Sequence, residues 1–285
     1  MTKPQRHASP LCAALRGAAA ALGGLSLWAA LAAAPATAQG VATAAPEASP
    51  PAQTQSQTQT QPQTQTQVHA LDGHRVTLDV YPAVGPLRGA AILSHGFTRS
   101  RRTLSGHAQA LADAGVLAIT PDLPCTFDFR CNARALAALV GALRAGGPFG
   151  QPVERVMLVG FSAGGLSSLL AAESPGVVGY VGLDPFDRVM SGETERLGLA
   201  AASRLRTEAL LLRAPPSRCS AEAVAAPWGP AMPALWRDEQ VAGASHCDFE
   251  SPTDWMCRLA CGGTDPARQQ QVRRGLLDAA ARWLR

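Results

Sequence analysis

Short apolar runs alternate along most of the chain with longer stretches in which apolar residues recur at helical spacing. Runs that are apolar at every position are typical of parallel strands covered on both faces, so the pattern predicts an α/β domain with a mainly parallel sheet and helices on both faces. The strands are expected at 76–81, 90–94, 116–120, 156–159, 177–183 and 209–212, with a weak strand near Val241, and the helices at 104–114, 132–145, 166–172, 191–204 and 266–284.

The start of the chain has a different pattern. A basic stretch is followed by an apolar, Ala-rich run over 17–34 and by an A-x-A sequence that ends at Ala38. This order is typical of an export signal, and we predict a signal peptide over 1–38 that is cleaved after Ala38. The alternative, an N-terminal membrane anchor, is disfavoured by the two glycines within the run and by the small residues at its end.

Residues 39–67 contain almost no large apolar side chains. A Pro-containing stretch is followed by alternating Gln and Thr over 53–67. Because such a segment has nothing to bury in a core, we predict a disordered linker over 39–67. Residues 68–285 remain, enough for one domain with a full core, and we expect this domain to be catalytic.

The formal charge of the chain is only +4, and the positive charges of Lys3, Arg6 and Arg16 belong to the predicted signal. A charge this small does not provide the electrostatic footprint that nucleic acid or an anionic membrane surface requires. We therefore expect no nucleic-acid partner. We also expect no stable membrane insertion after signal removal, and a monomer.

The cysteines of the predicted domain are even in number, which in an exported protein indicates disulfides and a periplasmic or extracellular location. Cys125 and Cys131 close a short loop and form the best local pair. The other four are expected to pair among themselves around the C-terminal loop, although sequence alone leaves the pairing open. These four are Cys219, Cys247, Cys257 and Cys261. A metal site formed by Cys247, Cys257 and Cys261 is the weaker alternative.

The sequence Gly160-Phe161-Ser162-Ala163-Gly164 directly follows the strand expected at 156–159. It matches the G-x-S-x-G nucleophile elbow, in which a sharp strand-to-helix turn holds a serine above the end of a sheet. Small neighbours are required there because a side chain on either glycine would collide across the turn. We interpret Ser162 as a candidate nucleophile.

A serine hydroxyl needs a histidine to accept its proton. Two histidines of the domain, His69 and His74, belong to the expected first hairpin, and His107 lies within a helix. His95 ends a strand, but the glycine after it suggests a backbone role for that loop. His246 follows the last strand, where the order serine, acid, histidine places the base, so we expect His246 to be the base.

The third member of a triad is a carboxylate that orients the histidine. Asp184 follows the apolar strand at 177–183 and precedes a proline that ends the strand, so it is the favoured acid. The alternatives are Glu222, the first carboxylate after the next strand, and Asp187, which we expect instead to order its loop. Asp248 and Asp254 lie too close to His246 in sequence and are expected to shape its loop.

Two backbone N–H groups are expected to form an oxyanion hole. One is that of Ala163, which follows the serine, and the other is that of Phe97, in the turn after Ser94-His95-Gly96. The Phe97 ring is expected to wall an acyl pocket. Trp228, Trp236 and Trp255 either line the substrate cleft or, as is commoner for large aromatic residues, pack in the interior.

These motifs together give the domain a resemblance to a known family. His95-Gly96-Phe97, the elbow, Gly182-Leu183-Asp184-Pro185 and His246 make residues 70–285 similar to the α/β-hydrolase superfamily, and more narrowly to its chlorophyllase-like and dienelactone-hydrolase or polyesterase-like branch. The resemblance implies the α/β-hydrolase fold and supports Asp184 as the acid. The signal, the linker and the cysteine-rich stretch over 247–261 depart from plant chlorophyllases.

The expected function is that of an exported serine carboxylic-ester hydrolase that forms an acyl-enzyme and needs no cofactor and no metal. Its substrate is expected to be a small-molecule or polymeric ester. Two alternatives stay open: a catalytically silent binding module that retains the hydrolase fold, and an amidase or peptidase that uses the same triad.

Overall fold

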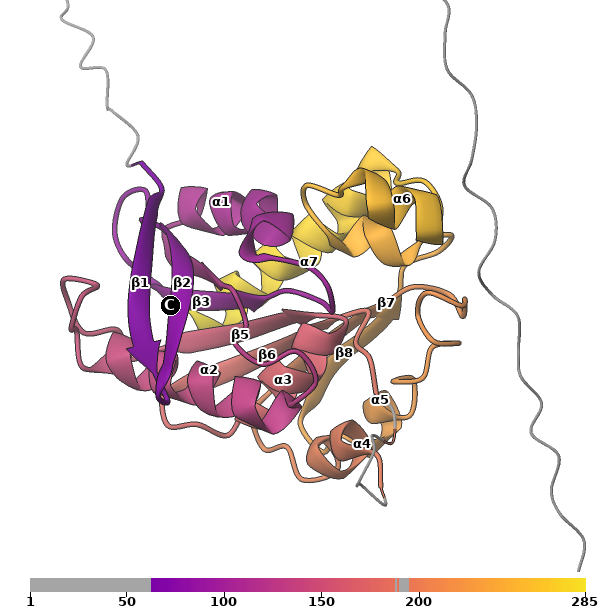
Figure 1. Cartoon of the computed structure of the whole chain (residues 1–285), viewed down its shortest axis with the longest axis horizontal. Helices are drawn as coiled ribbons and strands as arrows, with labels where there is room; N and C mark the ends of the chain where they lie inside the picture. The colour runs from indigo at the N-terminus through magenta and orange to yellow at the C-terminus, as the bar shows by residue number, and fades with distance from the viewer. Residues whose placement is uncertain (1–62, 188, 190–194) are drawn as a thin grey trace, which may run out of the picture. The chain divides into compact units, whose positions relative to one another are not determined.

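The computed structural model describes residues 63–187, 189 and 195–285 (Figure 1). The predicted signal peptide and almost all of the predicted linker lie outside these residues. Within them, one 8-stranded sheet has the order β1-β2-β4-β3-β5-β6-β7-β8, in which β2 pairs antiparallel with β1 and β4 and every other pair is parallel, as predicted. The strands are β1 Gln65–Leu71, β2 His74–Tyr81, β3 Gly89–Ser94, β4 Val116–Pro121, β5 Val156–Phe161, β6 Val177–Leu183, β7 Ala209–Arg213 and β8 Leu235–Gln240.

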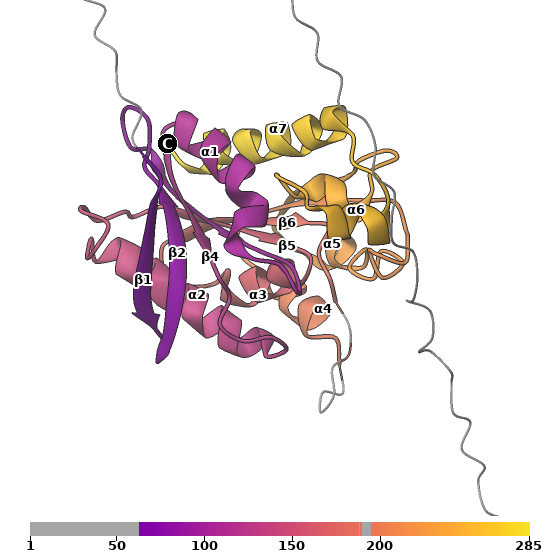
Figure 2. The same ribbon diagram turned by 45° about the horizontal axis from the view of Figure 1, so that its top comes forward.

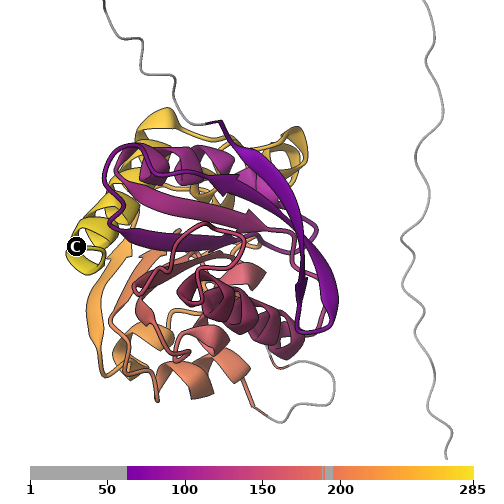
Figure 3. The same ribbon diagram turned by 90° about the vertical axis from the view of Figure 1, so that its left-hand side faces the viewer.

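The hairpin of β1 and β2 lies along one edge of the sheet (Figure 3). Strand β1 begins at Gln65, before the domain start predicted at residue 68. Its first residues pair with the end of β2, and Thr66 Oγ1 donates a hydrogen bond to Asp79 Oδ1 at 2.7 Å. Alternating Gln and Thr therefore serve as an edge strand here, because β-branched threonine suits a pleated surface and an edge tolerates polar side chains.

Helices cover both faces of the sheet (Figures 1 and 2). Helices α1 and α7 lie on one face, and α2 and α3 pack side by side on the other. Within the described ranges, no helix combines the length and the apolar character that crossing a bilayer requires. The helices are α1 Ser105–Asp113, α2 Phe129–Arg144, α3 Ala163–Ala171, α4 Leu197–Ala202, α5 Trp228–Ala231, α6 Trp255–Cys261 and α7 Pro266–Trp283, with 3₁₀ turns η1 Arg101–Leu104 and η2 His246–Phe249.

Alternate residues of the central strands enter different hydrophobic cores, which explains why these strands are apolar throughout. Ala91 and Leu93 of β3 join the core beneath α1 and α7, whereas Ala90 and Ile92 join the core beneath α2. Successive side chains of a strand point to opposite faces, so a strand buried on both faces cannot alternate apolar with polar residues.

The C-terminal third differs from the predicted pattern at several elements, among them α5, which was not predicted. Strand β8 comes before Val241, where only a weak strand was expected, and α6 was not predicted. The sequence of β8 is rich in charge, and Asp238 accepts hydrogen bonds from Arg213 of β7 at 2.7 and 2.9 Å. Pairing at the sheet edge, with these polar contacts, therefore forms a strand that hydrophobic periodicity does not indicate.

Three disulfides connect the cysteines of the domain: Cys125–Cys131, Cys219–Cys261 and Cys247–Cys257. The first is the predicted local pair, and the other four cysteines pair among themselves, as expected. Both C-terminal disulfides end on α6, so this helix is bonded to η2 and to the loop after β7.

Candidate active site

Ser162 lies in the sharp turn between β5 and α3, as the elbow motif predicts. Its backbone has φ 53° and ψ −120°, a positive φ that a residue with a side chain adopts rarely. A Cβ on Gly160 would overlap the carbonyl of Gly164, and a Cβ on Gly164 would overlap the carbonyl of Ser94. The turn is fixed further by the Ser162 N–H, which donates to Leu183 O at 3.0 Å. A strained serine held by its neighbours in this way is typical of functional sites.

The structure brings Asp184 and His246 together although 62 residues separate them in the chain. His246 Nδ1 lies 2.5 Å from Asp184 Oδ2, and the other carboxylate oxygen accepts from the Ala214 N–H at 3.0 Å. The His246 ring also packs on the ring of Phe161, with 4.6 Å between ring centroids. With Nδ1 bonded to the buried carboxylate, Nε2 is the nitrogen left to accept a proton.

Two further contacts position this pair. Asp184 directly follows β6, and its N–H donates to Leu212 O of the neighbouring strand at 2.7 Å. His246 begins η2, whose start is capped by the side chain of Asp248. Asp248 is fully buried and accepts from the N–H groups of Ser245 and Asp265 at 2.8 and 2.7 Å, so it shapes the histidine loop, as expected.

The other two candidate acids are Asp187 and Glu222. The contacts described for them do not involve His246. Asp187 is fully buried and accepts from the N–H groups of Gly198 and Leu199 and from Trp228 Nε1, at 3.1, 2.9 and 2.8 Å. These donors lie in α4 and α5, so Asp187 holds these two helices, and part of the loop that it was expected to order lies outside the described residues. Glu222 is exposed on the loop after β7.

The two candidate oxyanion donors lie at the start of α3 and in the turn after β3, which meet at the elbow. Ala163 is the first residue of α3, a position whose N–H has no partner within a helix. Phe97 follows Gly96, and a Cβ on Gly96 would lie 3.1 Å from the Cβ of Ser162. The turn that carries Phe97 therefore passes directly beside the serine.

Both ring nitrogens of His95 form hydrogen bonds that fix this turn. Its Nε2 accepts a hydrogen bond from the Leu123 N–H at 3.0 Å, so the ring is neutral and its Nδ1–H donates to Gly96 O at 2.8 Å. Burial lowers the pKa of His95, which agrees with a neutral ring. His69 and His74 lie on the first hairpin, and His107 lies within α1, as expected.

A cleft of about 600 Å³ contains both Ser162 and His246, and we call it the Ser162 cleft. One wall comes from the turn after β3 and another from α6. Trp255 lines the cleft. Trp228 is buried, and its indole N–H donates to Asp187, whereas Trp236 packs edge-on against Trp283. The described lining residues are Gly96, Phe97, Thr98, Arg99, Phe161, Ser162, Phe186, Cys219, His246, Trp255, Met256, Cys257, Leu259, Ala260 and Cys261.

Comparison with known proteins gives the family. Residues 91–284 match the model of the alpha/beta hydrolase family, a match that spans more than half of the chain and includes all five candidate site residues. The chain belongs to the alpha/beta hydrolase family. No protein of curated function matches the sequence of this alpha/beta hydrolase.

Solved structures share its fold at low sequence identity. A dienelactone hydrolase from Anabaena variabilis has a TM-score of 0.62 at 18% identity, covering 79% of this chain and 100% of its own. The esterase domain of a Rhodothermus marinus protein has a TM-score of 0.58 at 18% identity, covering 78% and 100%. Est1E from Butyrivibrio proteoclasticus has a TM-score of 0.54 at 16% identity, covering 76% and 99%. The predicted fold is thereby confirmed.

An ion-pair cluster that the sequence did not reveal connects two walls of the Ser162 cleft in this alpha/beta hydrolase. Arg99, just after the turn of Phe97, contacts Glu250 at 2.9 Å and Asp254 at 2.8 Å. Glu250 is fully buried directly after η2, and Asp254 caps α6 by accepting from the Cys257 N–H at 2.8 Å. Burial raises the pKa of Glu250 to about 7, which the charge of Arg99 opposes.

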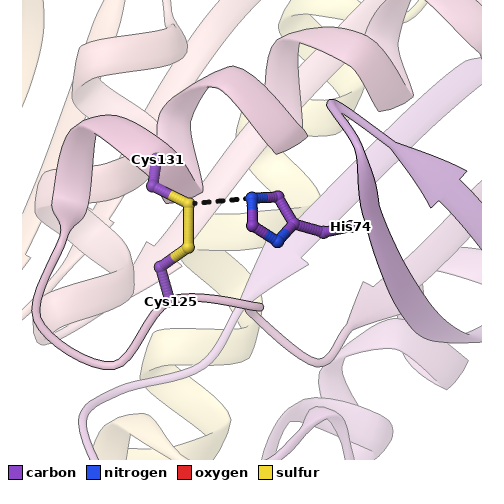
Figure 4. Close-up of side chains that lie close together, drawn as sticks. All are labelled: His74, Cys125 and Cys131. Carbon is purple, nitrogen blue, oxygen red and sulfur yellow. Dashed lines mark hydrogen bonds between the residues drawn. A yellow bond between two sulfur atoms is a disulfide. The ribbon is translucent and has the colours of Figure 1, made fainter.

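Two groups of potential metal donors contain disulfide sulfurs. In the first, His74 Nε2 lies 3.4 Å from Cys131 Sγ, and this sulfur is bonded to Cys125 (Figure 4). The second consists of Cys247, Cys257 and Cys261, all three of which are in disulfides. Metals bind cysteine as thiolate, so neither group fits a metal while its disulfides are intact.

Proposed function

We propose that this alpha/beta hydrolase is an exported serine carboxylic-ester hydrolase, with Ser162 as nucleophile, His246 as base and Asp184 as the residue that orients the base. The observation that carries the proposal is the contact of His246 with the buried carboxylate of Asp184 in the cleft that Ser162 also lines. A hydroxyl in a strained turn, an imidazole and a carboxylate form the set that acyl transfer requires.

In the proposed first half-reaction, Ser162 Oγ attacks the ester carbonyl and its proton passes to His246 Nε2. The carbonyl becomes a negatively charged tetrahedral oxygen, for which the N–H groups of Ala163 and Phe97 are the proposed donors. Asp184 stabilises the imidazolium and keeps the ring in the tautomer that leaves Nε2 free. Collapse of the intermediate expels the alcohol, which takes the proton from Nε2, and the acyl group stays on Ser162.

In the second half-reaction a water molecule attacks the acyl-enzyme. Its proton passes to the same nitrogen of His246, the tetrahedral intermediate forms again, and collapse returns the proton to Ser162 Oγ as the carboxylic acid leaves. Every proton is moved by side chains of this chain, so the proposed cycle requires no cofactor.

Two observations support export. The apolar run over 17–34 followed by an A-x-A sequence fits a cleaved signal, and three disulfides fit an oxidising compartment. Sequencing the N-terminus of the mature protein from a periplasmic fraction tests this proposal. We expect the mature chain to begin at Gln39, and a chain that retains residues 1–38 would contradict it.

The proposed chemistry is tested with p-nitrophenyl esters and matched p-nitroanilides, using the wild type and Ser162→Ala. We expect ester hydrolysis by the wild type that Ser162→Ala loses, with anilides at least about 10³-fold slower. Anilides hydrolysed as fast as esters would make the protein an amidase. A folded wild type that hydrolyses neither would favour a binding module on the same fold.

A further inference from the structure

The wall that α6 contributes to the Ser162 cleft exposes large apolar side chains. Trp255, Met256 and Leu259 are 66%, 45% and 80% exposed, and Phe97, on the turn beside the serine, is 45% exposed. All four line the cleft. Trp255 and Leu259 are four residues apart on one helix and so lie on the same side of α6. Contiguous exposed apolar side chains usually mark a surface that binds a partner or a ligand.

This apolar wall is held in place without help from a ligand. Helix α6 has only seven residues, too few to be stable alone. The Cys247–Cys257 disulfide bonds it to the turn of His246, and Cys219–Cys261 bonds its last residue to the loop after β7. Its first turn is fixed by Asp254, which caps the helix and contacts Arg99. The wall is therefore a preformed part of the site, which reduces the entropy cost of binding a ligand.

The cleft offers little to attract a charged substrate. Among its described lining residues, Arg99 is the one side chain with a permanent charge, and it is 10% exposed. Its guanidinium is already in contact with the carboxylates of Glu250 and Asp254 at 2.9 and 2.8 Å. A negatively charged substrate group would lose its hydration in the cleft and would gain no unpaired cation from these residues.

We infer that α6, together with Phe97, forms a subsite for a large, uncharged hydrocarbon group of the ester, either a long alkyl chain or an aromatic ring. The inference rests on the proposed function, because the subsite lies beside the proposed nucleophile. Contact with Trp255 and Leu259 removes apolar surface from water on both partners, so the preference increases with the size of the hydrocarbon group. A carboxylate at the far end of that group weakens binding.

The test compares kcat/KM for p-nitrophenyl acetate, p-nitrophenyl octanoate and the p-nitrophenyl monoester of octanedioic acid. For the wild type we expect octanoate to exceed acetate, and the neutral octanoate to exceed the carboxylate-bearing ester of equal length, each by about tenfold. The double variant Trp255→Ala/Leu259→Ser is expected to lose about tenfold on octanoate and less than about twofold on acetate. Both side chains are exposed, so the variant keeps the folded core.

Val68→Ser is the matched control, because Val68 is an apolar residue 54% exposed on β1 that does not line the cleft. It is expected to hydrolyse all three esters like the wild type. Equal loss by the double variant on acetate and octanoate, or a preference of the wild type for the carboxylate-bearing ester, would overturn the subsite. A wild type that hydrolyses none of the esters and does not react with a fluorophosphonate would overturn the proposed function itself.

Discussion

The wall of the Ser162 cleft at the sheet and the wall formed by α6 are held by different kinds of bond. Ser162 and Asp184 stand at the ends of neighbouring strands, and backbone hydrogen bonds to Leu183 and Leu212 fix them. Helix α6 lies outside the sheet, and two disulfides and an ion pair fix it. The difference teaches that the proposed nucleophile and its acid depend on buried strand ends fixed by backbone hydrogen bonds, whereas the proposed substrate preference depends on a cross-linked surface element.

The first experiment replaces the proposed nucleophile. Ser162→Ala is expected to reduce kcat by about 10⁵-fold or more, because no other group forms the acyl-enzyme. Hydrolysis of p-nitrophenyl acetate measures the loss, and unchanged thermal unfolding shows that the fold is intact. Activity close to that of the wild type would place the nucleophile elsewhere.

The second experiment compares the proposed acid with the exposed alternative acid. Asp184→Asn is expected to reduce kcat by about 10⁴-fold with the fold retained, because the amide favours the wrong tautomer of His246. Glu222→Gln, at the exposed alternative acid, is the control and is expected to be close to the wild type. The reverse result would transfer the orienting role to Glu222.

Asp187→Asn completes that comparison. Its carboxylate accepts from two backbone N–H groups and from the Trp228 indole, so the variant is expected to lose about 2–3 kcal/mol of unfolding free energy and little kcat per folded molecule. Urea unfolding measures the loss of unfolding free energy. Active-site titration counts the folded molecules, so that kcat is given per folded molecule. A fall in kcat like that of Asp184→Asn, without loss of stability, would contradict the division.

A fourth experiment loosens the α6 wall. Cys219→Ser/Cys261→Ser opens a link between residues 42 apart and is expected to cost about 3–4 kcal/mol of unfolding free energy. Per folded molecule of this variant, kcat/KM is expected to fall by about tenfold for p-nitrophenyl octanoate and to change little for p-nitrophenyl acetate. If both esters lose activity equally, the disulfide supports the catalytic groups and not the subsite.

The smallest net effect on the wild type is expected for pH, because two buried groups shift stability in opposite directions. Burial lowers the pKa of His107 from 6.5 to about 4, so the unfolded chain binds more protons between these values and stability is lost as pH falls through them. Burial raises the pKa of Glu250 from 4.5 to about 7, so the folded chain binds more protons there and stability is lost as pH rises. Each contribution is up to about 3 kcal/mol, and the two oppose each other.

Unfolding free energies of variants between pH 4.5 and 6.5 separate these contributions. We expect His107→Gln to become less stable with rising pH and Glu250→Gln to become more stable, whereas the wild type changes less than either. Parallel profiles for all three proteins would show that neither group titrates as its burial implies.

The sequence predicted the sheet wall well and the α6 wall poorly, for physical reasons. Strands buried on both faces are continuous apolar runs, and the candidate residues at their ends could be proposed from strand position together with the elbow motif for Ser162 and the following proline for Asp184. Helix α6 is short, and disulfides and contacts distant in sequence stabilise it, so no periodic pattern indicates it. The Arg99–Glu250 pair joins residues far apart in the chain, which the sequence alone did not connect.

The central claim is that the hydroxyl of Ser162 is activated by the imidazole that Asp184 holds. It is tested most directly by reacting the folded protein with a fluorophosphonate probe and identifying the modified peptide by mass spectrometry, in the wild type and in His246→Ala. We expect one adduct on Ser162 in the wild type and almost none in His246→Ala. An adduct on another residue, or equal labelling of Ser162 without the imidazole, would contradict the claim.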